Sequence, residues 1–414
     1  MIKRVLLVAY HYPPVAGSSG VQRTLKFSQY LPEFGWEPIV LTISLRAYEA
    51  VRKDQLGEIP ENLIVARAFG IDAARHLSVG GKYLDLLAYP DRWVSWWPTA
   101  VMVGRRLIRR YRVRAIWSTY PIATAHLIGR SLHLATSLPW IADFRDSMTE
   151  TYYPPDRRRR QVYRWIERRT VRDCSRALFT TPGAMRMYAE RYPEIPDRRW
   201  SVLANGFDEE NFTHVESRVT HSRRGGASLR LLHSGILYPE ERDPSAFFEA
   251  LAALKKSGRI SAQRLTIVLR ATGHDNYHRD LLARYGIADI VRLEPGIAYE
   301  SALQEMLEAD GLLLFQAANC NHQIPAKAYE YLRARRPVLA FTDPAGDTAG
   351  LLRDAGIDTI VPLDDANVIA ASLGEFLGML KQGSAPLASE AVIASHSRRQ
   401  RTEELATILN EVAD

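Results

Sequence analysis

The stretch QIPAKAYEYLRARRP, residues 323–337, joins two short apolar runs. GLLLF (311–315) precedes it and VLAF (338–341) follows it, and both runs are typical of buried strands. Pro325 lies where a first helical turn would begin, because its fixed φ suits that position and its missing N–H costs nothing there. This order of strand, helix and strand is the repeating unit of a parallel α/β sheet.

Lys327 and Glu330 are three residues apart, so on a helix they share one face. In open α/β sheets ligands bind beyond the carboxyl ends of the strands, and a helix N-terminus favours phosphate. A lysine there can hold a phosphate as a point charge, and a carboxylate one turn on can accept two hydroxyls of a ribose or sugar. An ordinary amphipathic helix with a surface Lys–Glu pair explains the same stretch equally well.

Length and composition indicate a soluble globular protein of more than one domain. The chain has 414 residues, more than one hydrophobic core usually serves. No apolar run approaches the ~20 residues of a membrane-spanning helix. Cys174 and Cys320 are too few for a disulfide framework, which fits a reducing cytoplasm. We therefore expect a cytoplasmic location.

Charge is unevenly distributed along the chain. Residues 1–200 contain 32 Lys and Arg and 18 Asp and Glu, a net charge of +14. The remaining residues contain 22 basic and 29 acidic side chains, a net charge of −7. A basic half predicts an anionic partner such as lipid headgroups, nucleic acid or a phosphorylated substrate.

Strand and helix patterns alternate along both halves. In the first half strands are expected at 5–9, 38–43, 63–67, 115–119, 140–144, 177–181 and 200–203, and helices at 21–34 (ending at Gly35), 99–111, 122–134, 156–176 and 183–192. In the second half strands are expected at 229–233, 265–269, 290–293, 311–315, 338–341 and 359–361, and helices at 244–256, 277–285, 300–309, 326–334, 347–355, 366–381 and 397–412. The polar residues 209–228 are interpreted as a linker or exposed loop. We predict two doubly wound α/β domains of similar size facing a cleft.

Three further segments stand out before any family is considered. The turn YHYPPVAGSSG (10–20) can direct backbone N–H groups at an anion, although it lacks the spacing of the dinucleotide fingerprint and of the P-loop. Asp143, Arg145 and Asp146 end a predicted strand and form either a polar site or a capping and salt-bridge cluster. The three tryptophans of YPDRWVSWWP (89–98) could stack on a sugar or lie at a membrane interface, but a core or cleft-wall role is favoured.

The stretch DRRRRQVYRWIERRTVRDCSR, residues 156–176, is the most basic part of the chain. A basic amphipathic helix suits an anionic membrane surface, and a solvated helix face is the more usual explanation of such a run. An RNA-binding role is the third alternative, but no known RNA-binding module is present.

Taken together, the motifs resemble those of GT-B glycosyltransferases of family 4, the retaining nucleotide-sugar-dependent branch. The resemblance covers nearly the whole chain. The motifs that carry it are YPPVAGSSG (12–20) with Arg23 and Leu25, PWIADFRD (139–146), LANGFD (203–208), HSGILYPEERDP (233–244), RLEPGIAYESALQEMLEADGLLL (292–314) and PAKAYEYLRARRPVLA (325–340).

The resemblance implies a donor phosphate site and a fold. Gly17 and Gly20 would let the first loop approach the donor diphosphate, and Lys327 and Arg242 would each contact a phosphate. Two Rossmann-like domains would face a cleft, an N-terminal acceptor-side domain at 1–204 and a C-terminal donor domain at 205–394. Residues 395–414 would cross back, so that the last helix packs on the N-terminal domain.

The resemblance also implies how the rest of the nucleotide is bound. Glu330 would bind the ribose, and Gly296 and Ile297 would lie against the base through backbone groups. The sequence departs from the family pattern at three positions. His322 replaces a glutamate eight residues before Glu330, Ile236 replaces a basic residue, and Arg145 replaces a histidine.

The chemistry implied by the family needs no strong enzymic base. Arg145, Asp143 and His322 would orient acceptor and sugar, while positioned cations stabilise charge on the leaving diphosphate. No clustered acidic pair of the kind that binds a divalent ion is apparent, so we predict no metal and no cofactor, with a nucleotide-sugar, UDP-sugar favoured, as substrate.

The expected function is transfer of a hexosyl group to a saccharide acceptor, lipid-linked in the simplest interpretation, in cell-surface polysaccharide biosynthesis. The basic N-terminal half would bring the enzyme to the inner membrane face as a peripheral protein, with no nucleic-acid partner. Two alternatives remain at this point, a GT-B nucleotide-sugar epimerase and a non-catalytic basic binding protein.

Overall fold

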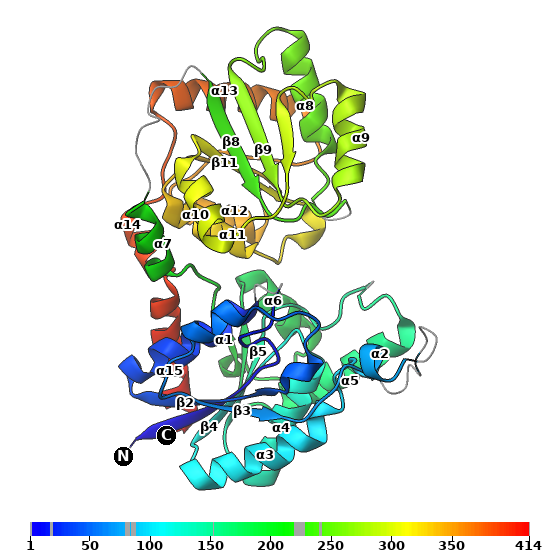
Figure 1. Cartoon of the computed structure of the whole chain (residues 1–414), viewed down its shortest axis with the longest axis vertical. Helices are drawn as coiled ribbons and strands as arrows, with labels where there is room; N and C mark the ends of the chain where they lie inside the picture. Colours follow the sequence, from blue (N-terminus) through cyan, green and yellow to red (C-terminus); the bar gives the residue numbers. More distant parts are fainter. Residues whose placement is uncertain are drawn as a thin grey trace. The chain divides into compact units, whose positions relative to one another are not determined.

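The computed structural model describes residues 2–16, 20–78, 83, 88–151, 153–218, 228–239 and 242–413. The chain divides into two compact units (Figure 1). The N-terminal unit is Met1–Asn205 with Arg398–Asp414, and the C-terminal unit is Gly206–Ser397. Each unit is a parallel sheet with helices on both faces, which confirms the predicted fold of two Rossmann-like domains.

The N-terminal unit has a seven-stranded sheet in the order β3-β2-β1-β4-β5-β6-β7. Its strands are β1 (Lys3–Val8), β2 (Trp36–Ile43), β3 (Ile64–Ala68), β4 (Ala115–Thr119), β5 (Trp140–Phe144), β6 (Arg176–Phe179) and β7 (Trp200–Val202). Its α-helices are α1 (Gly20–Tyr30), α2 (Ala73–His76), α3 (Trp96–Tyr111), α4 (Ala123–Thr136), α5 (Arg157–Asp173), α6 (Pro182–Arg191) and α15 (Arg398–Ala413).

The C-terminal unit has a six-stranded sheet in the order β10-β9-β8-β11-β12-β13. Its strands are β8 (Leu229–Ser234), β9 (Leu265–Arg270), β10 (Val291–Glu294), β11 (Gly311–Gln316), β12 (Val338–Thr342) and β13 (Ile360–Val361). Its α-helices are α7 (Glu209–Glu216), α8 (Ser245–Lys256), α9 (Asp275–Tyr285), α10 (Tyr299–Glu308), α11 (Ala326–Ala334), α12 (Asp347–Asp354), α13 (Ala366–Gln382) and α14 (Glu390–Ser395).

Strand β1 shows why its sheet is covered on both faces. Successive side chains of a strand point to opposite faces. Leu6 and Val8 belong to one core cluster, with residues of α3, α4, α5 and α6. Val5 and Leu7 belong to the other, with residues of α1 and α15. A strand buried on both faces is a continuous apolar run, which is the pattern that made this strand predictable.

The last helix, α15, packs beside α1 and thereby belongs to the N-terminal unit (Figure 1). Its Leu405 and Leu409 are fully buried in the core cluster on that face of the sheet. The predicted return of the C-terminal helix is confirmed. The N-terminal unit is therefore built from two separate parts of the chain.

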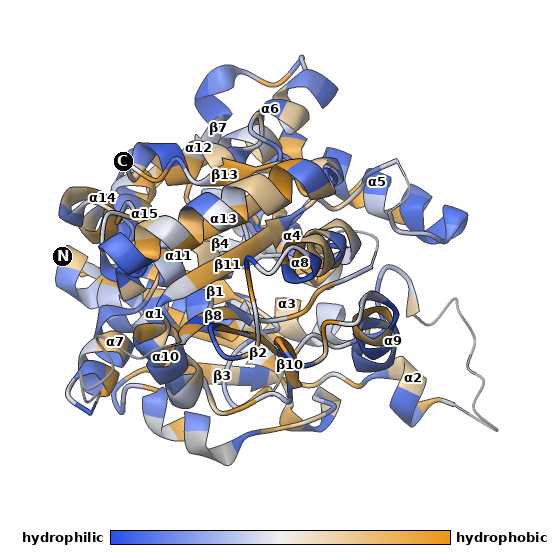
Figure 2. Cartoon of the chain, turned by 90° about the horizontal axis from the view of Figure 1, so that it is seen from above, coloured by the Kyte–Doolittle hydropathy of each residue, from blue (hydrophilic) through white to orange (hydrophobic). Residues whose placement is uncertain are grey.

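Helix α13 of the C-terminal unit is amphipathic. In Figure 2 hydrophobic and hydrophilic residues alternate along α13, whose Ile369, Leu373 and Phe376 are fully buried. The four- and three-residue spacing of these side chains places them on one helix face. They pack with Phe247 of α8 in the main core cluster of this unit.

Helix α7 lies where a loop was predicted, so the linker interpretation is wrong for Glu209–Glu216. Phe212 and Val215, three residues apart, are buried. Arg333 of α11 donates to the carboxylates of both Glu209 and Glu216, at 2.7 Å each. These partners lie more than a hundred residues away, so local polarity gave no sign of them. Residues 219–227 of the predicted linker lie outside the described part of the chain.

The structure also tests the predictions made for the tryptophan cluster, for Gly35 and for Pro325. Trp96 is fully buried and Trp93 and Trp97 pack against the core, which confirms the core interpretation. Gly35 ends the predicted helical segment with a left-handed φ of 81°. Pro325 is the residue before the first turn of α11 and not within it, one position from the prediction. Among the described residues, no helix has the length and apolar character needed to span a membrane.

Candidate active site

Lys327, near the start of α11, points at the end of β8. Its Nζ donates to Nε2 of His233 at 3.2 Å. A Cβ at Gly235, the first residue after β8, would lie 2.5 Å from that Nζ. Gly235 also has a φ of 119°, a conformation that L side chains rarely adopt. Glycine is therefore required at 235 both for backbone conformation and to leave room for the ammonium group.

His233 fixes the lysine without neutralising it. The imidazole is fully buried, and burial, together with the positive charge of Lys327, lowers the pKa of His233 well below its usual range. Nδ1 lies 2.8 Å from the carbonyl oxygen of Leu313 and Nε2 lies 3.1 Å from that of Gly235, and the tautomer that donates from Nδ1 leaves Nε2 to accept from Lys327. The lysine thus has an oriented partner that carries no charge.

The charge of Lys327 is not balanced by a neighbouring carboxylate in the described part of the chain. Burial, and secondarily the charge of Arg242, lowers the pKa of Lys327 to about 7, while Glu330 opposes the shift. Within the described part of the chain no carboxylate forms an ion pair with Lys327. A phosphate placed here would supply the missing negative charge, and the N-terminal end of α11 would favour the same ligand.

Arg242 is positioned by a polar partner and an aromatic ring. Its Nε donates to Oε1 of the buried Gln316, at the end of β11, at 3.0 Å. Its guanidinium lies 5.8 Å from the ring centroid of Tyr238. Neither neighbour is charged, so Arg242 adds to the positive potential at Lys327.

Glu330 lies one turn after Lys327, as the helix spacing predicted. Its Oε1 accepts from the hydroxyl of Tyr299, the first residue of α10, at 2.8 Å. The adjoining loop after β10 is held by Arg270, which donates to the carbonyl of Pro295 at 2.7 Å and pairs with the largely buried Glu305. Gly296 and Ile297 follow Pro295 and are exposed, so their backbone is accessible to a ligand.

His322 lies in the loop between β11 and α11, five residues before Lys327, and is partly exposed. Asn321 anchors this loop by donating from Nδ2 to Asp343 at 2.6 Å. Thr348 donates to the carbonyl of Gln323 at 2.9 Å. Asp343 and Thr348 both lie after β12, so the position of the His322 loop depends on contacts with the segment that follows the neighbouring strand.

Asp143, at the end of β5, is fully buried and paired. Both of its oxygens accept from the Arg23 guanidinium at 2.8 Å, and Thr119 donates to one of them at 3.0 Å. Arg23 also donates to the carbonyls of Leu203 and Ala204. For Asp143 the geometry favours the salt-bridge alternative, with the carboxylate orienting Arg23 and not facing a substrate.

Arg145 and Gly20 lie in the same unit. Arg145 follows β5 by one residue and is partly exposed. Gly20 is buried as the first residue of α1. Gly17 lies outside the described residues. The sequence motif that contains these glycines therefore has only its C-terminal end described.

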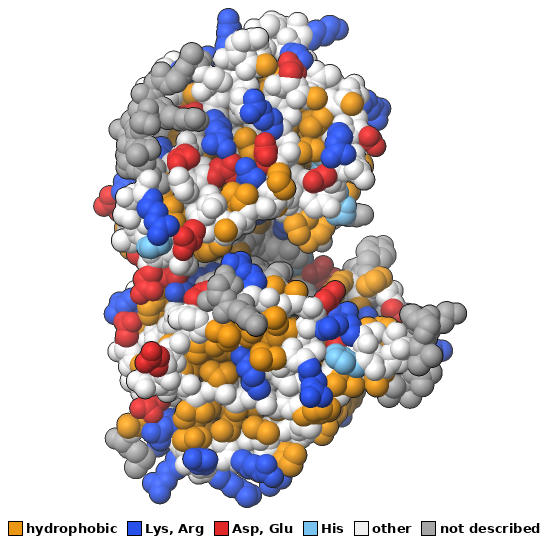
Figure 3. Space-filling view, viewed as in Figure 1, with side chains coloured by type: hydrophobic (Ala, Val, Ile, Leu, Met, Phe, Trp, Pro, Cys, Tyr) orange, Lys and Arg blue, Asp and Glu red, His pale blue; other side chains and the backbone are white. Residues whose placement is uncertain are grey.

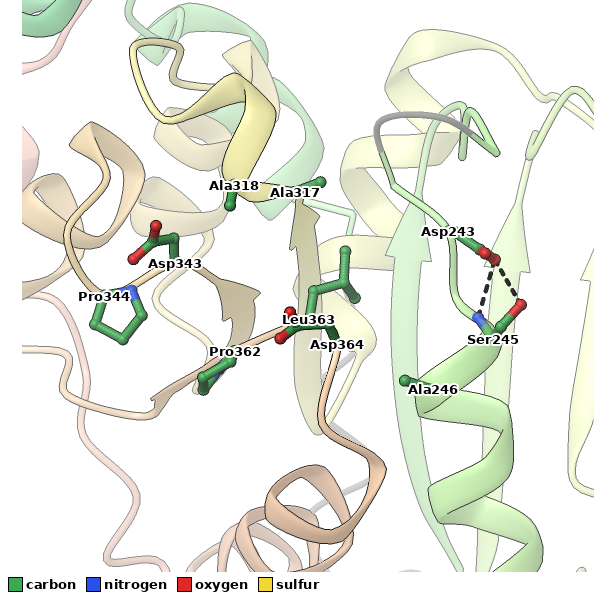
Figure 4. Close-up of a pocket in the computed structure, with 10 residues that line it drawn as sticks. All are labelled: Asp243, Ser245, Ala246, Ala317, Ala318, Asp343, Pro344, Pro362, Leu363 and Asp364. Atoms are coloured by element: carbon green, nitrogen blue, oxygen red, sulfur yellow. Dashed lines mark hydrogen bonds between the residues drawn. The ribbon is translucent and has the colours of Figure 1, made fainter.

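A separate cavity of about 570 Å³ opens at the carboxyl edge of the C-terminal sheet (Figure 4). It is lined by residues from the start of α8, from the loop before it and from the segments after β11, β12 and β13: Asp243, Ser245, Ala246, Ala317, Ala318, Asp343, Pro344, Pro362, Leu363 and Asp364. In Figure 4 Ser245 contacts Asp243 through its backbone N–H and its hydroxyl. None of the residues predicted for the donor site lines this cavity.

His233, Gly235 and Tyr299 were not assigned roles from the sequence. His233 and Gly235 stand in the motif HSGILYPEERDP, where the adjacent histidine, serine and glycine at the end of a predicted strand were the available signal. Tyr299 had no comparable signal, because only the packing of α10 beside α11 places it at Glu330.

Comparisons with known proteins agree with the fold. Residues 19–206 match the model of the glycosyl transferase 4-like domain. A glycosyltransferase from Rickettsia africae ESF-5 is 13% identical, with a TM-score of 0.68 over 99% of this chain and 98% of that chain. Anabaena HepE, solved with UDP and glucose, is 15% identical, with a TM-score of 0.64 over 99% and 100%. No curated protein matches the sequence significantly.

The same fold also serves another chemistry. The UDP-GlcNAc 2-epimerase from Neisseria meningitidis is 10% identical, with a TM-score of 0.55 over 99% of this chain and 100% of that chain. Fold likeness at such identity defines the GT-B architecture alone. The domain match over residues 19–206 and the GT-B architecture of the whole chain together support a glycosyltransferase of the family 4 type. The predicted class of enzyme is confirmed.

Proposed function

We propose that this enzyme transfers a hexosyl group from a nucleotide-sugar, with UDP as the favoured nucleotide, to a saccharide acceptor in cell-surface polysaccharide biosynthesis. The observation that carries the proposal is the lone ammonium of Lys327, held by a neutral histidine in the space left by Gly235. A donor diphosphate would supply the negative charge that pairs with this ammonium group.

The transfer follows from the charges at this site. Cleavage of the sugar–phosphate bond leaves negative charge on the diphosphate. Lys327, Arg242 and the N-terminal end of α11 stabilise that charge where it develops. The leaving phosphate accepts the proton of the attacking hydroxyl, so the anomeric configuration is retained without a strong enzymic base. We propose that the transfer needs no divalent metal ion.

Nucleotide recognition is assigned to the neighbouring elements. Glu330, oriented by Tyr299, accepts the ribose hydroxyls, and the exposed backbone of Gly296 and Ile297 contacts the base. The UDP bound to Anabaena HepE, a protein of the same fold, supports the choice of UDP as the first ligand to test.

Calorimetry with UDP, GDP, ADP, dTDP and CMP tests the donor site, on wild type and on Lys327→Ala and Glu330→Ala. Tight binding of one nucleotide that both variants weaken at least tenfold is expected. Glu300→Ala, an exposed glutamate on α10, is the matched control and should bind like wild type. If no nucleotide binds, the transferase proposal has no donor site here and must be abandoned.

An epimerase remains the second candidate, because a UDP-GlcNAc 2-epimerase shares the fold. Conversion of the donor sugar without an acceptor would identify it. Formation of a glycosidic product only when an acceptor is added, with retained anomeric configuration by NMR, supports the transferase. Activity in excess EDTA checks metal independence.

We further propose that α5 docks the enzyme on an anionic membrane surface at the cytoplasmic face. Trp165 is 49% exposed in the middle of the helix, and the other exposed residues of α5 are one glutamine and six arginines, Arg157, Arg158, Gln161, Arg164, Arg168, Arg169 and Arg172. Its one glutamate, Glu167, is buried. Each arginine near an anionic surface contributes about 1 kcal/mol, and an exposed tryptophan suits the interface.

The N-terminal unit has a second exposed basic helix, which provides the control. Figure 3 shows Lys and Arg side chains gathered along the edge of this unit where α3 lies, with Arg105, Arg106, Arg109 and Arg110 exposed. Sedimentation with phosphatidylglycerol vesicles should decrease at high salt. It should fall severalfold in Trp165→Ala with Arg168→Gln, and less in Arg105→Gln with Arg109→Gln. Equal losses in both pairs would refute a specific role of α5.

A further inference from the structure

The guanidinium group of Arg145 has no partner in the described part of the chain. It follows β5 at the carboxyl edge of the N-terminal sheet and is only partly exposed. Its Nε is buried without a hydrogen-bond partner, and no carboxylate forms an ion pair with it. Asp143, two residues before it, is already occupied by Arg23. Buried donors that lack a partner require an explanation such as an absent ligand. The Nε atoms of Arg159, Arg176 and Arg401 are also buried without a partner, but Arg176 and Arg401 form ion pairs through their terminal nitrogens and Arg159 lies over the Tyr89 ring.

Charges of both signs surround Arg145. Burial is the main cause that lowers the pKa of Arg145, and the charges of Arg23 and Arg398 act in the same direction. Asp146 and the paired Asp143 oppose them. Because Arg23 and Asp143 form an ion pair, Asp146 is the acidic group that acts most on Arg145, and in the described part of the chain the two side chains form no direct ion pair.

Two neutral hydrogen-bonding groups come from the same carboxyl edge of the N-terminal sheet. His11 follows β1, and burial, with Arg145 second, lowers the pKa of His11 to about 3, so the imidazole is neutral at physiological pH. Ser147, two residues after Arg145, has a buried hydroxyl with no hydrogen-bond partner among the described residues. A neutral imidazole and a hydroxyl can each donate one hydrogen bond to an anion.

We propose that Arg145, His11 and Ser147 form an anion subsite that binds a phosphate group of the sugar acceptor. A guanidinium binds phosphate through two parallel N–H bonds, which a neutral sugar cannot match. The inference rests on the proposed function and adds to it that the acceptor is phosphorylated. It also assigns a positive role to the arginine that departs from the family pattern at this position.

The phosphate can belong to a soluble sugar phosphate or to a lipid-linked saccharide. Both present the same anion to Arg145, so binding to the residue does not separate them. Glucose 6-phosphate and dihexanoyl phosphatidic acid below its micelle concentration serve as probes of the two sources. Methyl glucoside is the uncharged comparison.

The test is calorimetry on the full chain with saturating UDP, so that Lys327 is occupied. Inorganic phosphate and at least one phosphorylated probe should bind wild type, and methyl glucoside should bind at least tenfold more weakly. Arg145→Gln should weaken phosphate binding at least tenfold and leave UDP affinity unchanged. Arg145→Lys should retain part of the affinity. Arg105→Gln, which removes an exposed arginine from α3, should behave like wild type.

Three results would overturn the inference: phosphate that does not bind in the presence of UDP, equal phosphate affinity in Arg145→Gln and wild type, or a loss confined to UDP affinity. The last would place Arg145 on the donor. Failure of the proposed function is a different result, namely that UDP itself does not bind. In that case phosphate is titrated into Lys327→Ala, where a further tenfold loss in Arg145→Gln supports the subsite and equal affinities refute it.

Discussion

At the residue scale, the site depends on where charge is left unbalanced. Lys327 has a neutral partner, whereas the buried carboxylate of Asp143 is fully paired. Unpaired charge in a partly buried place destabilises the free protein and is relieved by a ligand of opposite sign. Unpaired cations are therefore better markers of function here than conspicuous charged motifs.

Donor affinity should depend on pH through Lys327. The pKa of Lys327 is about 7 in the free protein, and a bound diphosphate raises it, so binding above pH 7 takes up a proton. UDP affinity should fall with rising pH between 7 and 9, by up to about tenfold per pH unit. Calorimetry in buffers of different ionisation enthalpy measures the proton uptake. Lys327→Arg stays charged and should lose this pH dependence; an unchanged slope would contradict the assignment.

Gly235→Ala should weaken UDP binding at least tenfold. The added Cβ would lie 2.5 Å from Lys327 Nζ and displace it. The φ of 119° adds strain of about 1–3 kcal/mol. Gly258→Ala is the control, since Gly258 has a φ of 73° and open space around its Cα. It should lose stability without losing UDP affinity, and equal binding losses in both variants would argue against the displacement of Lys327.

At the element scale, apolar patterns predict where helices occur, and buried polar contacts determine how those helices pack against one another. Glu167 of α5 is fully buried, and four groups donate to its carboxylate: Thr149, Tyr188, Arg191 and Tyr192, at 2.6–3.0 Å. Three of these donors lie on or beside α6, so this carboxylate ties α5 to α6. The same network turns the basic face of α5 outward.

Glu167→Ala should destabilise the N-terminal unit by about 3–5 kcal/mol, because it leaves Arg191 and two tyrosines without their acceptor. Urea unfolding followed by tryptophan fluorescence measures the change. Glu190→Ala, an exposed glutamate of α6, should change stability by less than about 0.5 kcal/mol. A comparable effect of both substitutions would show that the buried network contributes little.

At the scale of the whole molecule, the N-terminal unit is completed by a helix that the chain supplies last. Leu405 of α15 is fully buried with residues of β1 and α1. The unit defined by Met1–Asn205 therefore lacks part of its core until Arg398–Asp414 has docked. The C-terminal unit is continuous and has no such requirement.

Leu405→Ala should destabilise the N-terminal unit by about 2–5 kcal/mol through the cavity it leaves. The unfolding transition of the C-terminal unit should not move, and calorimetric scans can resolve the two transitions. Leu387→Ala, at a site 48% exposed in the C-terminal unit, is the control and should change neither. A shift of only the C-terminal transition in Leu405→Ala would contradict the division of the chain.

The amino-acid sequence by itself determined the alternation of strands and helices, the two sheets and the helical face shared by Lys327 and Glu330, because these follow from periodicity and local chemistry. Tertiary structure alone decided the rest. The polar stretch Glu209–Glu216 forms a helix because Phe212 is buried and Arg333 pairs with Glu209. Asp143 is paired with Arg23, which lies 120 residues away in the sequence. The space at Gly235 and the lone charge of Arg145 depend on which strands end side by side. Pairing between distant residues leaves no periodic trace in a single sequence, so only the folded chain shows which charges remain for a ligand.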